Sequence, residues 1–112
     1  MKAGDQAERI AAGYLQRKGL ALIQTNYRCR WGEIDLVLRD RDTIVFTEVK
    51  LRHSKSFGGA SYSVTPRKQT RIIAAARHYL AGKKETPCRF DVVLLERLKP
   101  PRIEWIRDAF SA

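Results

Sequence analysis

Apolar residues recur every three or four positions in two segments of the chain, and this spacing predicts two amphipathic helices. The first helix runs from about Asp5 to Lys18, and Gly19 follows where a helix commonly ends. The second helix has Thr65 as its N-cap and Pro66 at its first helical position, and it ends at Gly82. The stripes expected to face the core are Ala7, Ile10, Ala11, Tyr14 and Leu15 in the first helix, and Ile72, Ile73, Ala76, Tyr79 and Leu80 in the second.

Between the two helices, shorter apolar runs predict three strands. Residues 20–29 form the first, and Gly32 opens a second over residues 33–39. The third covers residues 43–51.

The strand over residues 43–51 is apolar on both faces in its first half. Ile44 and Phe46 point to one face, and Val45 and Val49 point to the other. This pattern is typical of a central strand that is covered on both sides.

After the second helix, residues 89–95 predict a fourth strand, and Pro100-Pro101 turn the chain into a short edge segment over residues 103–106. The order is therefore α-β-β-β-α-β with a trailing strand. An α/β fold with a mixed central sheet flanked by helices, in one domain spanning residues 1–112, closes such a chain most simply. A chain of 112 residues is long enough to bury one hydrophobic core without disulfide bonds or structural metal ions.

Residues 52–64 are polar, with Gly58-Gly59 near the centre and no clear periodicity. A loop of this length in so small a domain is expected to be either functional or disordered.

The chain is strongly basic, with 22 Lys and Arg against 12 Asp and Glu, a net charge of +10. Such a surplus favours a polyanionic partner, because each phosphate contact releases condensed counterions. An anionic membrane would also attract this charge, but the sequence holds no apolar run long enough to span a bilayer and no helix that is basic on one side and apolar on the other. We therefore expect nucleic acid, with no membrane partner.

Cys29 and Cys88 are far apart in the sequence and share no C-x-x-C spacing, which argues against a zinc site or a disulfide framework. The first residues turn polar at once and lack the apolar region of a signal peptide. We expect a cytoplasmic protein with both thiols reduced.

The second and third strands are joined around Arg41-Asp42 and should form an antiparallel hairpin. With a two- or four-residue loop, Asp35 lies directly opposite Glu48, and Glu33 opposite Lys50. Three carboxylates and a lysine then share one face of the hairpin. A three-residue loop would reverse every side chain and disperse this patch.

Clustered carboxylates repel one another and raise each other's pKa unless a cation lies between them. Mg²⁺ and Mn²⁺ prefer carboxylate oxygens, so the patch is suited to a hard divalent ion. Lys50 beside it could hold an attacking water or offset charge on a phosphate. The alternative is structural: Glu48 and Lys50 form an ion pair at the strand end, and Asp35 simply ends its own strand.

At these residues the sequence resembles a known nuclease signature. Residues 32–36 (GEIDL) and 46–52 (FTEVKLR) look like the PD-(D/E)-x-K motif, without its first proline, since Ile34 precedes Asp35. More closely, the chain resembles the small bacterial YraN-like family of predicted endonucleases, relatives of archaeal Holliday-junction resolvases. The likeness covers nearly the whole chain and extends to Gly4, Glu8, Ala11, Asn26-Tyr27-Arg28, Phe57-Gly58, Lys68 and Arg89-Phe90-Asp91.

The resemblance implies a restriction-endonuclease-like core and a Mg²⁺- or Mn²⁺-dependent endonuclease acting on DNA. Asp35, Glu48 and the Val49 backbone carbonyl would ligate the metal, and Lys50 would position or activate the water. Glu8 corresponds to a helical acid that helps to hold the metal or its water, although a glutamate in a first helical turn is also favourable for the helix dipole. Resolvases cut two strands symmetrically, which leaves a homodimer open.

Further residues are candidates around this site. Lys68 and Arg71 lie on one side of the second helix, near its positive N-terminal end, and suit a phosphate. Three residues that follow Lys50 could close over a nucleic-acid backbone, while five others are expected to be core or supporting residues. The expected backbone contacts are Arg52, His53 and Lys55. Trp31 and Tyr27 are expected in the core, with stacking on a base as the alternative. Arg89 and Asp91 are expected to form an ion pair beside the site, and Glu33 is expected at its rim.

Two other functions remain open. A nucleic-acid-binding module of the same fold without chemistry would explain the charge and the loops equally well, but not the acids. An adaptor that docks on an acidic protein would show little salt-sensitive affinity for DNA.

Overall fold

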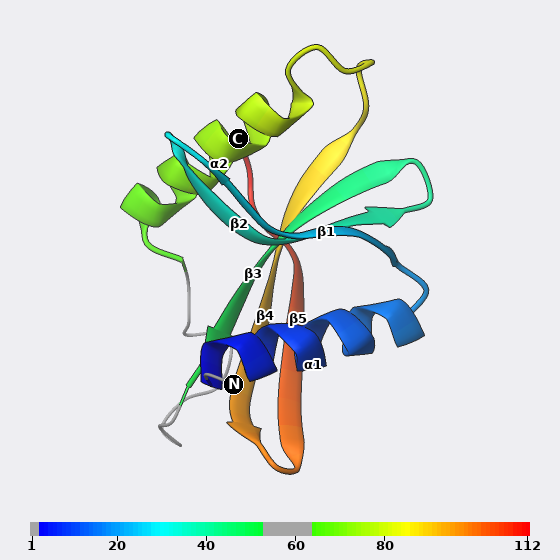
Figure 1. Ribbon diagram of the computed structural model, residues 1–112, viewed down its shortest axis with the longest axis vertical. Coiled ribbons are helices and arrows are strands. Elements are labelled where there is room, and N and C mark those ends of the chain that lie inside the picture. The colour runs from blue at the N-terminus through cyan, green and yellow to red at the C-terminus, as the bar shows by residue number, and fades with distance from the viewer. Residues whose placement is uncertain (1–2, 53–63) are drawn as a thin grey trace.

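One five-stranded sheet runs through the protein, with a helix packed on each face (Figure 1). The computed structural model describes residues 3–52 and 64–112, so the greater part of the predicted loop, with His53 and Lys55, lies outside the described residues. The elements in chain order are α1 (Ala3–Arg17), β1 (Ala21–Cys29), β2 (Gly32–Asp40), β3 (Thr43–Leu51), α2 (Pro66–Leu80), β4 (Cys88–Leu98) and β5 (Pro101–Phe110).

The strand order in the sheet is β1-β2-β3-β4-β5. Neighbouring strands are antiparallel except β3 and β4, which are parallel and are joined through α2. The mixed sheet and the α-β-β-β-α-β order are therefore as predicted. None of the helices in the described part of the chain is long and apolar enough to cross a membrane.

Local chemistry explains where α2 begins and why a glycine follows each helix. The Thr65 hydroxyl accepts a hydrogen bond from the Lys68 amide at 3.2 Å, so Thr65 is the N-cap, and Pro66 begins α2. Gly19 and Gly82 both have positive φ, which glycine adopts without a steric cost after a helix ends.

The central strand β3 is covered on both sides, as its apolar pattern predicts. Ile44 and Phe46 belong to the core cluster under α2, and Val45 belongs to the cluster under α1. The sheet therefore separates two apolar layers, and β3 contributes to both.

The last strand is longer than predicted, because β5 spans ten residues rather than residues 103–106. Asp91 on β4 is fully buried, and its carboxylate accepts hydrogen bonds from the Trp105 indole and the Asp108 amide, both at 2.9 Å. These bonds hold the polar second half of β5 on the sheet, which the apolar pattern alone does not reveal.

Gly32 at the start of β2 lies directly against the backbone of α2. A Cβ atom at this position would be 2.8 Å from the carbonyl oxygen of Arg71. Only glycine therefore permits this approach, and it fixes where β2 begins, three residues before Asp35.

Replacing Gly32 by alanine should destabilise the fold by about 1–3 kcal/mol, because the added methyl group meets a backbone atom that cannot move alone. Thermal unfolding followed by circular dichroism would measure this loss. Gly4→Ala in α1 is the matched control, since a Cβ there has nothing within 4 Å, and it should be neutral or slightly stabilising. Equal melting temperatures for the two variants would contradict the close approach.

Candidate active site

Asp35 and Glu48 lie at the point where β2 and β3 stop pairing. The ladder between the strands runs from Asp40↔Thr43 to Leu36↔Thr47, the register expected for a two-residue loop. Past its end, the Val49 amide donates a hydrogen bond to Oδ2 of Asp35 at 2.8 Å. The predicted juxtaposition of Asp35 and Glu48 is thereby present, and the Glu48 side chain is close enough to raise the pKa of the Asp35 carboxyl.

The Asp35 carboxyl has a pKa raised from 3.8 to about 7. Burial is the largest cause, because it penalises the charged form, and the negative charge of Glu48 adds to it. The Val49 amide and the Lys68 ammonium act in the opposite direction. Near neutral pH, this pair of acids therefore attracts either a proton or a cation.

A cation from the chain itself already contacts the pair. Glu48 is 6% exposed, and its Oε2 lies 3.2 Å from Nζ of Lys68 on the first turn of α2. Burying a carboxylate without a partner would be costly, so this ion pair compensates part of that cost. Lys68, expected as a phosphate contact, is thus also a neighbour of the acids.

Glu8 reaches the same region from α1. Its pKa is raised, first by burial and then by the negative charge of Asp35, and a hydrogen bond from the Asn26 side chain lowers it in part. The charge of Glu33 also raises it. Acidic groups from α1, β2 and β3 therefore influence one another electrostatically across the end of the ladder.

Asn26 was assigned no role from the sequence, although it holds Glu8. It lies within β1 with a φ of 52°, a left-handed conformation that asparagine tolerates better than most residues. An asparagine inside a strand is uncommon, and this was the signal available in the sequence.

Lys50 is exposed and follows Glu48 by two positions on β3. Its partner in the parallel register is Leu94, which belongs to the core under α2, so Lys50 is on the α2 side of the sheet, as Glu48 is. Val49 between them is half-buried on the α1 side.

The donor set fits a hard divalent cation in chemistry. Asp35 and Glu48 supply carboxylate oxygens, the ligands that Mg²⁺ and Mn²⁺ prefer. Among residues 3–52 and 64–112, however, no group of three or more His, Cys, Asp or Glu side chains is assembled closely enough to hold a metal ion. Within these ranges Asp35 and Glu48 thus offer two adjacent carboxyl groups, and an ion bound by them would need further ligands.

Comparison with known proteins identifies the family. The model of the uncharacterised protein family UPF0102 matches residues 7–95. The chain belongs to this family. It is 55% identical over 109 residues to a UPF0102 protein of Nitrosomonas europaea, covering 96% of this chain and 92% of the relative. It is also 54% identical over 111 residues to a UPF0102 protein of Cupriavidus taiwanensis, covering 97% and 82%.

A third UPF0102 relative, from Nitrosospira multiformis, is 52% identical over 109 residues and covers 96% of this chain and 92% of its own. Together these matches confirm the YraN-like family assignment. Their names state no activity, so the nuclease superfamily stays a prediction for UPF0102.

Glu33 lies at the rim of the acidic site rather than within it. It forms an exposed ion pair with Arg28 on β1, at 3.1 Å. The predicted pairing of Glu33 with Lys50 is absent from the β2–β3 ladder, because the ladder ends at Leu36↔Thr47.

Arg89 and Asp91 form the predicted ion pair, with 3.0 Å between Nε and Oδ1, but its expected place beside the site was wrong. Arg89 is opposite Val45 in the register, on the α1 side of the sheet, and also binds Asp40 near the β2–β3 turn. The parallel pairing of β4 with β3 sets this position. The pair holds β5 and the turn together rather than supporting Asp35.

Other candidates are distributed around the site. Arg71 is exposed on α2, and Arg52 is half-buried with its amide bonded to the Leu95 carbonyl at 2.7 Å. Trp31 was expected in the core, yet it is 51% exposed with the Arg30 guanidinium over its ring at 4.9 Å. The short β1–β2 turn carries it outward.

Tyr27 is half-buried against the core under α2, as expected, and its hydroxyl is hydrogen-bonded to Nδ1 of His78. This contact joins the edge strand β1 to the exposed side of α2.

The raised pKa of Asp35 predicts a pH-dependent stability in metal-free buffer. The folded chain holds the Asp35 proton up to about pH 7, whereas the unfolded chain releases it near 3.8, so this carboxyl lowers stability progressively as pH rises between those values. Asp35→Asn removes the penalty while keeping an acceptor for the Val49 amide. With EDTA present, the variant should melt at least about 4–8 °C above the wild type at pH 8, which is the shift expected for each kcal/mol of the penalty, and close to it at pH 4.

Asp42→Asn is the matched control, because Asp42 is exposed in the β2–β3 turn and its substitution should not alter the pH profile. If the melting temperature of Asp35→Asn differed from that of the wild type by the same amount at both pH values, the pKa shift of Asp35 would be refuted.

Proposed function

We propose that this UPF0102 chain is a metal-dependent endonuclease that hydrolyses DNA phosphodiester bonds, with branched or junction DNA as its substrate class. The observation that carries the proposal is the pair of adjacent carboxyl groups, Asp35 and Glu48, held at the end of the β2–β3 ladder beside Lys50. Binding a phosphate gains nothing from acids at the contact, whereas metal-assisted hydrolysis requires them.

Asp35, Glu48 and the Val49 carbonyl would hold Mg²⁺ or Mn²⁺, with Glu8 assisting directly or through water. When bound, the ion would supply a lower pKa for its water and compensation for charge on the phosphate. The Val49 amide orients Asp35 through its 2.8 Å hydrogen bond, so the ligand is fixed before any ion arrives.

Lys50 would supply a positive charge next to the attacking water. Its exposed ammonium, on the same side of the sheet as Glu48, can hold a water in line with the scissile phosphate and stabilise the charge that develops there. Lys68 can exchange its ion pair with Glu48 for a phosphate contact once the acids are neutralised by the metal.

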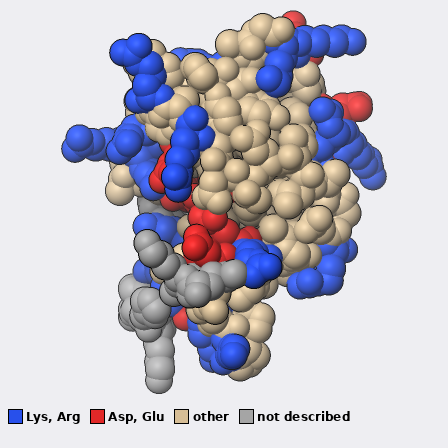
Figure 2. Space-filling model, in the orientation of Figure 1, with Lys and Arg blue, Asp and Glu red and all other residues tan. Residues whose placement is uncertain are grey.

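The charge distribution suits a polyanionic substrate. Figure 2 shows a small patch of acidic atoms near the centre of the face, with lysine or arginine side chains above and to the right of it; further acidic atoms lie at the upper right. The net charge of +10 would draw DNA to the surface, and Arg52, Arg71, His53 and Lys55 are proposed to bind its backbone.

The alternative function is a nucleic-acid-binding module of the same fold without catalysis. The ion pair between Lys68 and Glu48 favours it, because that pair satisfies Glu48 without a metal. The absence of a three-ligand cluster in the described part of the chain points the same way.

We also propose that the chain works in the cytoplasm, where its two free cysteines would stay reduced. A homodimer, which symmetric cleavage of two strands would use, stays a prediction.

The decisive experiment is cleavage of labelled four-way-junction, flap and linear DNA with Mg²⁺ or Mn²⁺. The wild type should cut a branched substrate, and Lys50→Ala and Asp35→Asn should each be slower by about 100-fold or more, because the first removes the cation that stabilises the developing charge and the second removes a ligand of the metal. Lys99→Ala, an exposed lysine in the β4–β5 turn, should cut at the wild-type rate.

A binding measurement separates the two functions. Mn²⁺ should raise the melting temperature of the wild type but not that of Asp35→Asn, since only the native state of the wild type binds the ion. If the ion stabilises neither protein, and all variants bind DNA without cutting it, the nuclease proposal is rejected in favour of the nucleic-acid-binding module.

A further inference from the structure

A second basic feature lies at the opposite end of α2 from the acids. A pocket of about 630 Å³ opens between the C-terminal end of α2, the segment that follows it, and strands β1 to β3. Ile23 and Ile44 contribute apolar surface to it, and Ile23 is 42% exposed, although it is a large aliphatic residue.

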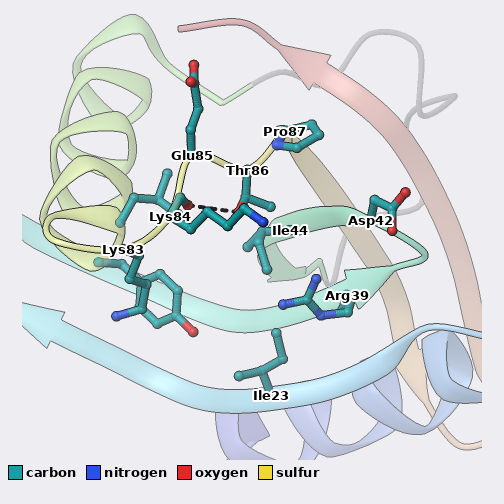
Figure 3. A pocket seen from close by; sticks show the side chains of 11 residues that line it. Ile23, Arg39, Asp42, Ile44, Lys83, Lys84, Glu85, Thr86 and Pro87 are labelled. Atoms are coloured by element: carbon teal, nitrogen blue, oxygen red, sulfur yellow. Dashed lines mark hydrogen bonds between the residues drawn. The ribbon is translucent and has the colours of Figure 1, made fainter.

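Two cations extend into this pocket. Figure 3 shows Arg39 from β2 and Lys84 from the segment after α2 pointing toward one another. Asp42 and Glu85 also line the pocket, but their carboxylates point away from these two cations. Neither Arg39 nor Lys84 forms an ion pair with any residue in the described ranges. Two converging cations without a carboxylate between them create a local potential that favours an anion.

The segment that carries Lys84 is held in place. The Pro87 carbonyl accepts a hydrogen bond from the Ile44 amide at 2.9 Å, and the Lys84 carbonyl accepts one from the Thr86 hydroxyl at 2.9 Å. The Lys83 amide is bonded to the Leu80 carbonyl at 3.0 Å. The cationic pocket is therefore part of the folded structure, and its backbone needs little ordering when a ligand binds.

The neighbouring surface suits the rest of a nucleotide. Tyr79 also lines the pocket, and the Lys83 ammonium lies 4.7 Å from the centre of its ring. An aromatic ring and aliphatic side chains beside cations fit a sugar or base next to a phosphate.

We propose that this pocket, centred on Arg39 and Lys84, is a second DNA-backbone site that binds a phosphodiester of the strand outside the acidic site. The proposal rests on the proposed function insofar as both sites bind one DNA molecule. α2 has 15 residues, so its ends are about 21 Å apart, and Lys68 in its first turn is next to Glu48. That distance corresponds to about six nucleotide steps along one strand of a duplex.

The test is binding of a fluorescent DNA duplex, measured by anisotropy in EDTA between 50 and 200 mM salt, conditions that exclude metal and cleavage. The double variant Arg39→Gln/Lys84→Gln should bind about tenfold or more weakly, and the slope of log K against log salt should become shallower by about 2, because two phosphate contacts are lost. Arg97→Gln/Lys99→Gln removes the same charge at the β4–β5 turn and should leave both quantities near their wild-type values.

The charge-conserving variant Arg39→Lys/Lys84→Arg should restore the salt slope, which a merely structural role would not predict. Equal affinity and slope for the pocket variant and its charge-matched control would overturn the proposal. So would weaker binding with an unchanged slope.

The outcome is independent of the proposed chemistry. If wild-type protein binds through this pocket but cuts no DNA, the nuclease fails and the pocket stands. If the wild type cuts DNA and the pocket variant binds and cuts equally well, the pocket fails and the nuclease stands. If millimolar inorganic phosphate raises the melting temperature of the wild type but not that of the pocket variant, while both proteins bind DNA equally well, the pocket binds a free anion and the proposal of a DNA site is overturned.

Discussion

The double covering of β3 is the constraint from which the rest of the fold follows. Its side chains alternate between the core under α2 and the core under α1, so a change of register by one residue would exchange the two layers. The strand is held by antiparallel β2 on one side and parallel β4 on the other. Its C-terminal half thus emerges at a defined place, and Glu48 and Lys50 are carried with it.

The acidic site exists because one ladder ends before the strands do. Past Leu36↔Thr47 the backbone groups of β2 and β3 no longer pair, and the Asp35 carboxylate replaces a backbone carbonyl as the acceptor for the Val49 amide. A buried backbone donor is satisfied in this way, and a carboxylate is fixed next to Glu48. The same hydrogen bond therefore contributes both to the stability of the fold and to the geometry of the site. The burial of Asp35 that accompanies it raises the pKa of this carboxyl.

Much of this arrangement could be predicted from the sequence, because short-range rules determined it. Helix capping by Thr65, the two-residue turn at Arg41-Asp42 and the apolar pattern of β3 all act between near neighbours, and together they imply that Asp35 meets Glu48. The errors concern longer-range partners. Which cation reaches Glu48 depends on how α2 crosses the sheet, and the location of Arg89 depends on β4 pairing in parallel.

The second half of β5 was missed for a related reason. Its polar residues are held by one buried acid on another strand, Asp91, and no local periodicity encodes such a bond. The role of Asn26 was missed for the same reason, because its interaction with Glu8 joins β1 to α1 and no local pattern encodes it.

The two outer strands of the sheet are both irregular. β1 has a register shift between Leu22 and Gln24 and a left-handed residue at Asn26. β5 pairs with β4 through two register shifts and has a left-handed residue at Asp108. Strands interrupted in this way are poor templates for another strand, so the sheet resists extension from either side. Copies of this chain would therefore be kept from edge-to-edge aggregation, and any assembly they form would have to use side-chain surfaces rather than a continuous intermolecular sheet.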